Sequence, residues 1–309
     1  MNLKEIVTKI FEERKITPSD GLGDIYQAEI YLQQSYEGRY FFELIQNVRD
    51  ANKEIGTDGS VFIDLSENTL VISNTGAEFS SQGIKGITRI GKSTKGSQDF
   101  IGFKGIGFKS IQEITEEPKI ITQYGSVYFD RKLTLKYYVD KTLEVDEIPL
   151  FYFPHFNDRK LSIAEVSKGI VTKIELLIKE NITEENIIEA FSEIKAKQLI
   201  LLGNIEKLHF TSANYIKKFA IKKNQEKRFI EVREDDNSIL KFKYFTPSNK
   251  IIIPEAVIQL LSGKEKKIFS NSSSVDINIV LEIAENGQIK SIDDAKLYLF
   301  YPLQISSGF

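Results

Sequence analysis

The stretch Glu43-Leu44-Ile45-Gln46-Asn47-Val48-Arg49-Asp50-Ala51 decides the fold that we predict for this chain. It places a carboxylate, a carboxamide and a second carboxylate at helical spacing, in Glu43, Asn47 and Asp50. At about 3.6 residues per turn, these three side chains project from one face of a helix. A polar strip of this kind can hold a hydrated magnesium ion and orient a water molecule at a phosphate.

The helix that carries this strip is predicted over residues 39–54, after a short amphipathic helix at 3–14 and a second helix near 24–36. On the 39–54 helix, the apolar side chains cover one broad arc beside the strip: Phe41, Leu44, Ile45, Val48 and Ala51. The polar strip thus borders the buried face, as expected of a helix that lines a site. Residues 18–23, rich in proline and glycine, are predicted to form a loop.

Strands are predicted at 61–65 and 69–73, joined as a hairpin, then within 118–139, at 170–178 and around 207–210. A helix near 184–198 precedes the last of these. This mixed order favours an α+β sandwich over a βαβ repeat. Beyond about residue 212, lysine-rich strands alternate with turns. We therefore expect a first domain over residues 1–212 and the start of a second, incomplete α+β domain over 213–309.

A glycine-rich segment, Gly102-Phe103-Lys104-Gly105-Ile106-Gly107-Phe108, follows the hairpin. Its glycines let backbone N–H groups turn toward phosphate oxygens, and a helix beginning there offers its positive end. A polar loop precedes it, so it is not the dinucleotide fingerprint, and the P-loop pattern is absent. Residues 80–115 as a whole are predicted to form a mobile loop that ends in a helix near 105–112.

The composition is that of an ordinary soluble protein of 309 residues with a net charge of −3. The chain has no cysteine, which excludes disulfides, thiolate catalysis and cysteine-bound zinc. Its two histidines, His155 and His209, lie far apart and are interpreted as structural. The N-terminus is charged where a signal peptide is apolar, and no run is long enough to span a bilayer. We expect a cytoplasmic protein without a membrane partner.

Taken together, these segments resemble the GHKL ATPase superfamily of gyrases, heat-shock chaperones, histidine kinases and MutL. The similarity covers residues 24–210 and is closest to the branch that includes sacsin and the plant protein NO VEIN, on the runs Lys92–Lys95 and Lys104–Ser110. It implies a Bergerat-type α/β sandwich, in which helices cover a mixed, mainly antiparallel sheet.

The resemblance also assigns roles to residues. Glu43 matches the general base of the family, Asn47 its magnesium ligand, and Asp50 a nucleotide contact. Ser73-Asn74-Thr75-Gly76 lies where the family has Asp-x-Gly beneath the adenine, and Thr172 matches the threonine that supports that position. Lys92 and Ser93 fall at the start of an ATP lid, residues 83–104. The glycine box that grips the phosphates matches Gly102, Lys104, Gly105, Ile106, Gly107 and Phe108.

Several of these positions have a simpler interpretation, and two depart from the family. For Asp50 the simpler alternative is a cap or a local pair with Arg49 or Lys53, and Phe103 and Phe108 are interpreted as core anchors. Asn74 replaces the usual aspartate, and its amide can present either an acceptor to adenine or the reverse pattern to guanine. Glu78 stands where many relatives carry a further glycine.

The resemblance implies Mg²⁺-dependent ATP binding and slow ATP hydrolysis that drive a lid or domain switch in a larger protein, chaperone-like or defence-related. One alternative is a nucleotide-sensing interaction module with negligible turnover. Another is a protein that processes DNA with ATP, as gyrase and MutL do. The expected partners are ATP or ADP, the remainder of a longer polypeptide or a partner subunit, and an ATP-dependent second copy. A nucleic-acid partner is left open.

Overall fold

A computed structural model of the chain describes residues 2–34, 37–89, 107–138, 143–224, 226, 228–235, 238–245, 251–252, 254–260, 274–275, 279–290, 296–298 and 302–306. The chain divides into one unit of residues 1–96, 100–195 and 202–218, and a second of 97–99, 196–201 and 219–309. The fold is α+β, as predicted, with extensive and mostly antiparallel strand pairing. The domain identities expected for the two parts stay predictions.

The sheet of the first unit has the strand order β7-β1-β2-β6-β3-β4-β5. All neighbours in it are antiparallel except β1 and β7, which run parallel. The strands are β1 (Gly59–Ser66), β2 (Thr69–Asn74), β3 (Thr115–Thr122), β4 (Gly125–Tyr128), β5 (His155–Asn157), β6 (Thr172–Ile178) and β7 (Ile205–Thr211). The predicted hairpin is confirmed: β1 and β2 pair from Val61↔Asn74 to Ser66↔Thr69 around a two-residue turn.

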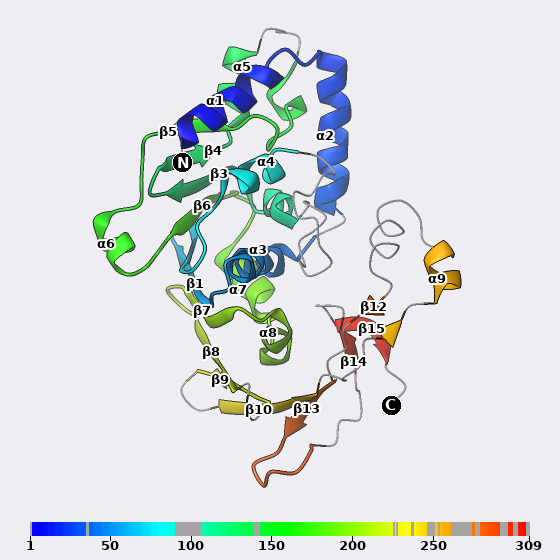
Figure 1. The fold of residues 1–309 in the computed structure, drawn as a ribbon. Coiled ribbons are helices and arrows are strands. Elements are labelled where there is room, and N and C mark those ends of the chain that lie inside the picture. Colours follow the sequence, from blue (N-terminus) through cyan, green and yellow to red (C-terminus); the bar gives the residue numbers. More distant parts are fainter. Residues whose placement is uncertain are drawn as a thin grey trace. The chain divides into compact units, whose positions relative to one another are not determined.

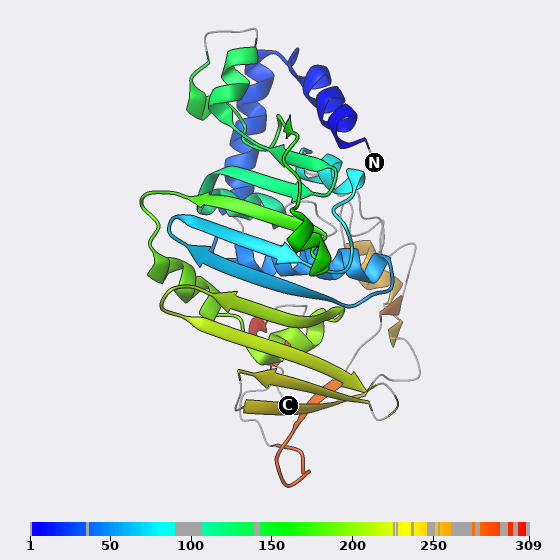
Figure 2. The same cartoon turned by 90° about the vertical axis from the view of Figure 1, so that its left-hand side faces the viewer.

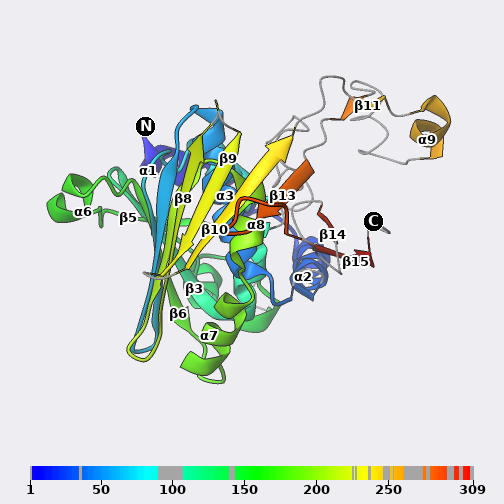
Figure 3. The ribbon, with the colours of Figure 1, turned by 90° about the horizontal axis from the view of Figure 1, so that it is seen from below.

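Helices α2 (Ser19–Gln34), α3 (Tyr40–Glu54) and α7 (Glu184–Ser192) lie on one face of this sheet (Figures 1 and 3). Figure 2 shows the sheet from its opposite face, with these helices behind the strands. Alternate residues of each strand point to the helices, because side chains alternate across a strand. In β1, Val61, Ile63 and Leu65 are buried, whereas Asp64 and Ser66 are exposed.

Aromatic rings fill the space between α3 and the sheet. Phe41 of α3 meets Phe191 of α7 edge-to-face at 5.3 Å between ring centroids, and Phe191 stacks on Phe210 of β7 at 4.6 Å. Such rings bury large apolar areas and prefer these geometries. The cluster fixes α3 on the sheet from three elements that are far apart in the sequence.

The remaining elements of the first unit lie around this layer. They are α1 (Leu3–Arg14), α4 (Ser81–Ile87), the 3₁₀ helices η1 (Gly107–Glu113) and η2 (Val145–Glu147), α5 (Arg131–Tyr137) and α6 (Ile163–Ser167). The second unit includes strands in the order β13-β10-β9-β8, all antiparallel. Its described elements are α8 (Ala196–Leu202), β8 (Ile216–Asn224), β9 (Phe229–Glu234), β10 (Ser238–Phe245), β11 (Ile251–Ile252), α9 (Glu255–Leu260), β12 (Ser274–Val275), β13 (Ile279–Ile283), β14 (Lys296–Tyr298) and β15 (Pro302–Ser306).

The loop predicted at 18–23 is wrong, because α2 already begins at Ser19. The Leu22 N–H donates to the Pro18 carbonyl at 3.1 Å, and the Leu22 side chain is fully buried with Tyr138, Ile148 and Phe153. Proline is compatible with a helix start, where its missing N–H costs nothing. Burial of one leucine thus outweighs the low helix propensity of two glycines.

Residues 81–87 were also predicted as loop, and they form α4 instead. The Ser80 hydroxyl caps the helix by accepting from the Gly83 N–H at 3.1 Å, and Ile84 and Ile87 are buried. The helix predicted near 105–112 is described from Gly107 as the 3₁₀ helix η1. The glycine and serine content of this region favoured a loop, whereas the burial of Ile84 and Ile87 stabilises a helix.

Two further boundaries differ from the prediction. Within 118–139, the segment Arg131–Tyr137 is helix α5, capped by Asp130, whose carboxylate accepts from the Leu133 N–H at 2.8 Å. The helix predicted at 184–198 is two helices, α7 and α8. In both places the apolar runs were recognised, but their local caps and breaks were not.

Candidate functional site at the ends of helix α3

Glu43 of α3 and Gly107 of η1 lie against each other. The Glu43 side chain is only 6% exposed, and a Cβ atom added to Gly107 would stand 1.9 Å from its Oε2 atom. A side chain at position 107 would require the Glu43 carboxylate to move from this place. The polar strip and the end of the glycine box, which the sequence separates by more than sixty residues, therefore meet in space.

Asn47 lies one helical turn beyond Glu43 and is half-buried. Its carboxamide oxygen and the Glu43 carboxylate are ligand types that Mg²⁺ prefers, and Mg²⁺ usually binds few protein groups while keeping waters and phosphate oxygens. No three Asp, Glu or His side chains gather as a metal group in the part of the chain that the structure describes. The donor set fits an ion held by one or two side chains and a bound phosphate.

Asp50 is fully buried, and its Oδ1 accepts from the Arg49 guanidinium at 2.8 Å. This is the local pairing that the sequence left open, and it neutralises the buried charge. Its role toward a nucleotide stays a prediction. On the same helix, the Gln46 side chain is 1% exposed, and its Nε2 has no hydrogen-bond partner among the described residues. Sequence reasoning had assigned nothing to Gln46.

Asn74 and Thr172 stand side by side on β2 and β6, where they are register partners. The Asn74 amide nitrogen donates to the carbonyls of Thr75 and Ala77, at 3.3 Å each. Turning the amide over would set its oxygen against two carbonyl oxygens, so the neighbours fix its orientation. The Oδ1 atom accepts no hydrogen bond from the described residues, and it is the atom left for a ligand.

Thr172 holds the chain that follows Asn74. Its hydroxyl accepts from the Phe79 N–H at 3.1 Å. Gly76, which lies between Asn74 and Phe79 in the sequence, has a φ of 98°, a backbone conformation that favours glycine. The Glu78 side chain is exposed, and its carboxylate accepts a hydrogen bond from the Gln123 amide. The φ angle of Glu78 is not positive, so the backbone at this position does not require glycine. The missing glycine at position 78 is therefore tolerated.

Asn52, near the C-terminal end of α3, was missed by the sequence. It is fully buried, its Oδ1 accepts from the Ala77 N–H at 2.9 Å, and its Nδ2 donates to the Asn204 carbonyl at 2.9 Å. A Cβ on Gly76 would stand 2.2 Å from its Oδ1. A polar residue on the apolar arc of a helix is a detectable sign of such a role. Helix α3 thus connects the Glu43 end of the site to the loop beside Asn74.

The other predicted positions divide into two groups. Phe108 is 7% exposed and meets Phe151 edge-to-face at 5.6 Å, which confirms it as a core anchor. Six predicted contacts, and most of the predicted lid, lie outside the described residues: Lys92, Ser93, Gly102, Lys104, Gly105 and Ile106. Among the helices of the described part, none is long and apolar enough to cross a bilayer.

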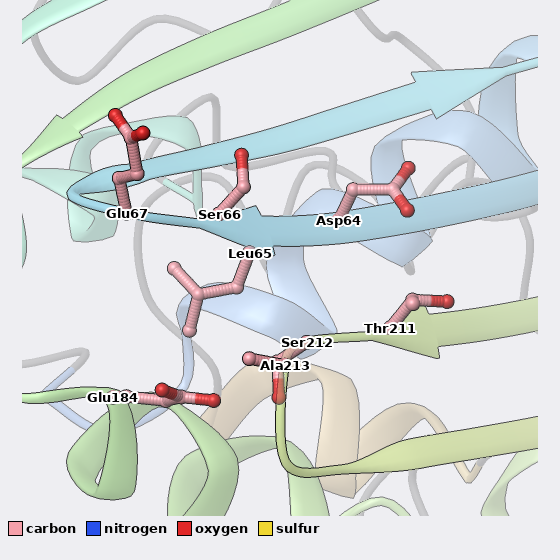
Figure 4. Close-up of a pocket in the computed structure, with 8 residues that line it drawn as sticks. All are labelled: Asp64, Leu65, Ser66, Glu67, Glu184, Thr211, Ser212 and Ala213. Atoms are coloured by element: carbon pink, nitrogen blue, oxygen red, sulfur yellow. The ribbon is translucent and has the colours of Figure 1, made fainter.

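A pocket of about 340 Å³ lies elsewhere, at the hairpin end of β1. It is lined by Asp64, Leu65, Ser66, Glu67, Glu184, Thr211, Ser212 and Ala213. Figure 4 shows that Asp64 and Glu67 point away from Glu184, so the carboxylates do not converge. At about 3.3 Å per residue, the length of β2 separates this pocket from Asn74. It is therefore distinct from the site at α3.

Comparison with known proteins supports part of the expected relationship. No protein-family model matches the chain. The chain is 32% identical to "Protein NO VEIN" of Arabidopsis thaliana over 103 residues, which are 33% of this chain and 4% of that protein. It is also 32% identical to human "Sacsin" over 108 residues, 29% of this chain and 2% of sacsin. The chain thus resembles one small segment of each of these very long proteins.

Proposed function

We propose that the first unit binds ATP with Mg²⁺ and hydrolyses it slowly, as a nucleotide-driven switch within a larger protein. The observation that carries this proposal is the contact of Glu43 with Gly107, with Asn47 one turn away and Asn74 near the other end of α3. Backbone N–H groups at a glycine are suited to bind a phosphate, and a carboxylate beside them is suited to accept a proton from the attacking water. An amide with a free acceptor is suited to an adenine amino group.

In this proposal, Glu43 accepts a proton from a water molecule that attacks the γ-phosphorus. The new bond joins the water oxygen to that phosphorus, the bond to the β–γ bridging oxygen breaks, and ADP leaves with the bridging oxygen. Mg²⁺, held through the Asn47 carboxamide oxygen and phosphate oxygens, would neutralise charge on the β- and γ-phosphates. Backbone N–H groups beginning at Gly107 would face the phosphates.

Asn74 would select the base. Because its amide nitrogen is held by the carbonyls of Thr75 and Ala77, its Oδ1 presents an acceptor toward the ligand. Adenine has an amino group at its 6-position, which can donate to the Asn74 Oδ1. Guanine has a carbonyl oxygen at that position, which is an acceptor like the Oδ1 itself. This orientation supports ATP, in preference to GTP, as the nucleotide of the proposal.

A second function, nucleotide sensing without useful turnover, is favoured by the burial of Glu43. A carboxylate that is 6% exposed and packed on Gly107 has little room for an attacking water. In both functions the nucleotide would act on the remainder of a longer polypeptide or on a second subunit. NO VEIN and sacsin, of which similar segments form 4% and 2%, suggest that setting.

The test measures ATP and GTP binding with Mg²⁺, and then phosphate release, for the wild type, Glu43→Ala and Asn47→Ala. Hydrolysis requires that Glu43→Ala binds ATP but loses turnover by about 10²-fold or more. Asn47→Ala is expected to weaken the Mg²⁺ dependence of binding. Equal, negligible release from wild type and Glu43→Ala would select the sensing function. Absence of any nucleotide binding would refute both.

A further inference from the structure

Lys109 of η1 and Glu29 of α2 form a buried ion pair. Their side chains are 1% and 0% exposed, and Lys109 Nζ lies 3.8 Å from Glu29 Oε1. The Glu29 carboxylate also accepts from the backbone N–H groups of Leu150 at 2.6 Å and Phe151 at 3.1 Å. Two charges removed from water need such partners, because an isolated buried charge is very unfavourable.

The Lys109 ammonium also donates to the carbonyl of Ile87, the last residue of α4. The last carbonyls of a helix have no partner within it, and a cation is favourable there. The next carbonyl, of Thr88, accepts from the Arg14 guanidinium at 2.7 Å, and Arg14 also donates to Tyr152 O at 2.5 Å. Two cations from distant parts of the chain thus bind the C-terminal end of one short helix.

The position of Lys109 in the sequence connects its hydrogen bond with the end of α4 to the candidate site. It lies two residues after Gly107 on the same 3₁₀ helix, and the Ser110 hydroxyl donates to the Gly107 carbonyl at 2.7 Å. Gly107 in turn sits against Glu43 with no room for a methyl group. A shift of η1 along its axis would therefore change the Glu43–Gly107 contact directly.

We propose that Lys109 is a positioning residue of the nucleotide site: its ammonium ties the end of α4 to η1, and this sets Gly107 on Glu43. The Glu29 carboxylate stabilises the charged form of that buried ammonium, and helix α2, which carries Glu29, holds the carboxylate in place. The proposal rests on the proposed ATP site. It assigns helix α2, which carries none of the nucleotide motifs, to the machinery of that site.

A purely structural ion pair predicts something different. Replacing both members of a buried pair by neutral groups of similar size is often neutral for stability or even favourable, whereas removing one member is strongly destabilising. The double variant Glu29→Gln/Lys109→Met removes both charges and keeps an acceptor for one of the two backbone N–H groups, Leu150 or Phe151, because a carboxamide has one oxygen where the carboxylate has two. It also removes the donor to the Ile87 carbonyl, and so separates stability from positioning.

The experiment compares the wild type, Lys109→Met, the double variant and Lys179→Met by urea unfolding and by ATP titration with Mg²⁺. Lys179 is the control, since its ammonium also donates to a backbone carbonyl, at 2.6 Å to that of Gln112, but this carbonyl belongs to η1 and not to α4, and Lys179 pairs with Glu116 at 2.8 Å. We expect the double variant to regain part of the stability that Lys109→Met loses, since it no longer buries an unpaired charge but leaves one backbone N–H group without its acceptor. Its Kd for ATP is expected to rise about tenfold or more, while that of Lys179→Met stays within about twofold.

A double variant that is as stable as the wild type and binds ATP equally well would overturn the proposal. If the double variant does not fold, Lys109→Arg decides, because it retains a cationic donor. Binding by Lys109→Arg within about threefold of wild type supports positioning, whereas a loss as large as in Lys109→Met overturns it.

Hydrogen–deuterium exchange without nucleotide keeps the proposal testable if the wild type binds no ATP, which would refute only the proposed function. Positioning requires faster exchange in the segments 81–89 and 107–113 of the double variant, at matched global stability, than in the wild type. Unchanged exchange in these two segments would reject the positioning role, whether or not ATP binds.

Discussion

Gly107 lies so close to Glu43 that a methyl group on its α-carbon would stand 1.9 Å from the Oε2 atom of that carboxylate, and 2.8 Å from its Cδ. The contact joins the start of η1 to the first turn of α3. At this point two motifs found separately in the sequence become neighbours in space. Gly107 is not among the glycines with a positive φ, so its backbone conformation does not favour glycine. The close approach to Glu43 does.

Gly107→Ala is therefore expected to force Glu43 and η1 apart. The cost should be about 1–3 kcal/mol in the free energy of unfolding, the usual range for overpacking, together with weaker ATP binding. Urea unfolding and ATP titration measure the two effects. Gly23→Ala is the control: it lies in α2 with nothing within 4 Å of an added Cβ, and should be neutral or more stable by up to about 1 kcal/mol. Equal behaviour of the two variants would contradict the contact.

Asn74 is expected to distinguish bases by the group at their 6-position. ITP carries an oxygen at the 6-position where ATP carries an amino group, and its N1 carries a proton where N1 of ATP is an acceptor; the sugar and phosphates are the same. Because the Asn74 Oδ1 is the free atom of the amide, ITP should bind about 10–100-fold more weakly than ATP. Calorimetric titration with both nucleotides measures the ratio. Asn74→Ala should abolish the difference, and a wild type without preference would show that the amide does not read the base.

Asn52→Ala should strongly destabilise the first unit. The substitution leaves the Ala77 N–H and the Asn204 carbonyl without their partner in a fully buried place, at a cost of roughly 2–4 kcal/mol. Asn214→Ala is the control, because Asn214 is exposed and makes one long contact of 3.4 Å with Glu184. It should change the free energy of unfolding by less than about 0.5 kcal/mol. Similar losses for both asparagines would disprove the bridging role of Asn52.

His155 should make the fold sensitive to acid. It is 8% exposed, lies between the rings of Phe11 and Tyr128, and its Nε2 is 2.8 Å from the Thr134 hydroxyl oxygen. That hydroxyl donates to the Asp130 carbonyl, so the ring nitrogen is its donor. Burial lowers the pKa of His155 below its ordinary value of about 6.5.

The sign follows from proton linkage. Below about pH 6.5 the unfolded chain binds a proton at His155 that the folded chain resists, so stability falls as the pH decreases, by at most about 1.4 kcal/mol per unit. Above pH 6.5 the contribution is complete. Unfolding measured from pH 5 to pH 8 should show this slope in the wild type and a smaller one in His155→Gln. Parallel curves would mean that another group is responsible.

Much of the architecture could be predicted from local patterns. The 3.6-residue period placed α3 and its polar strip, and the two-residue period with a polar turn placed the β1–β2 hairpin. Both patterns depend on residues that are neighbours along the chain, so the sequence alone determined which faces of these elements are polar. The spacing of Glu43 and Asn47 also needed no partner to be recognised.

Only the tertiary structure decided how those faces are used. The start of α2 depends on the burial of Leu22, α4 on that of Ile84 and Ile87, and the orientation of the Asn74 amide on two carbonyls that fold back toward it. Asn52 and Lys109 acquire their roles from groups that lie tens of residues away. Propensities are worth tenths of a kcal/mol per residue, whereas burying a side chain or leaving a buried polar group unpaired is worth about 1–3 kcal/mol. Long-range burial therefore determined the details of the site that local pattern could not reach.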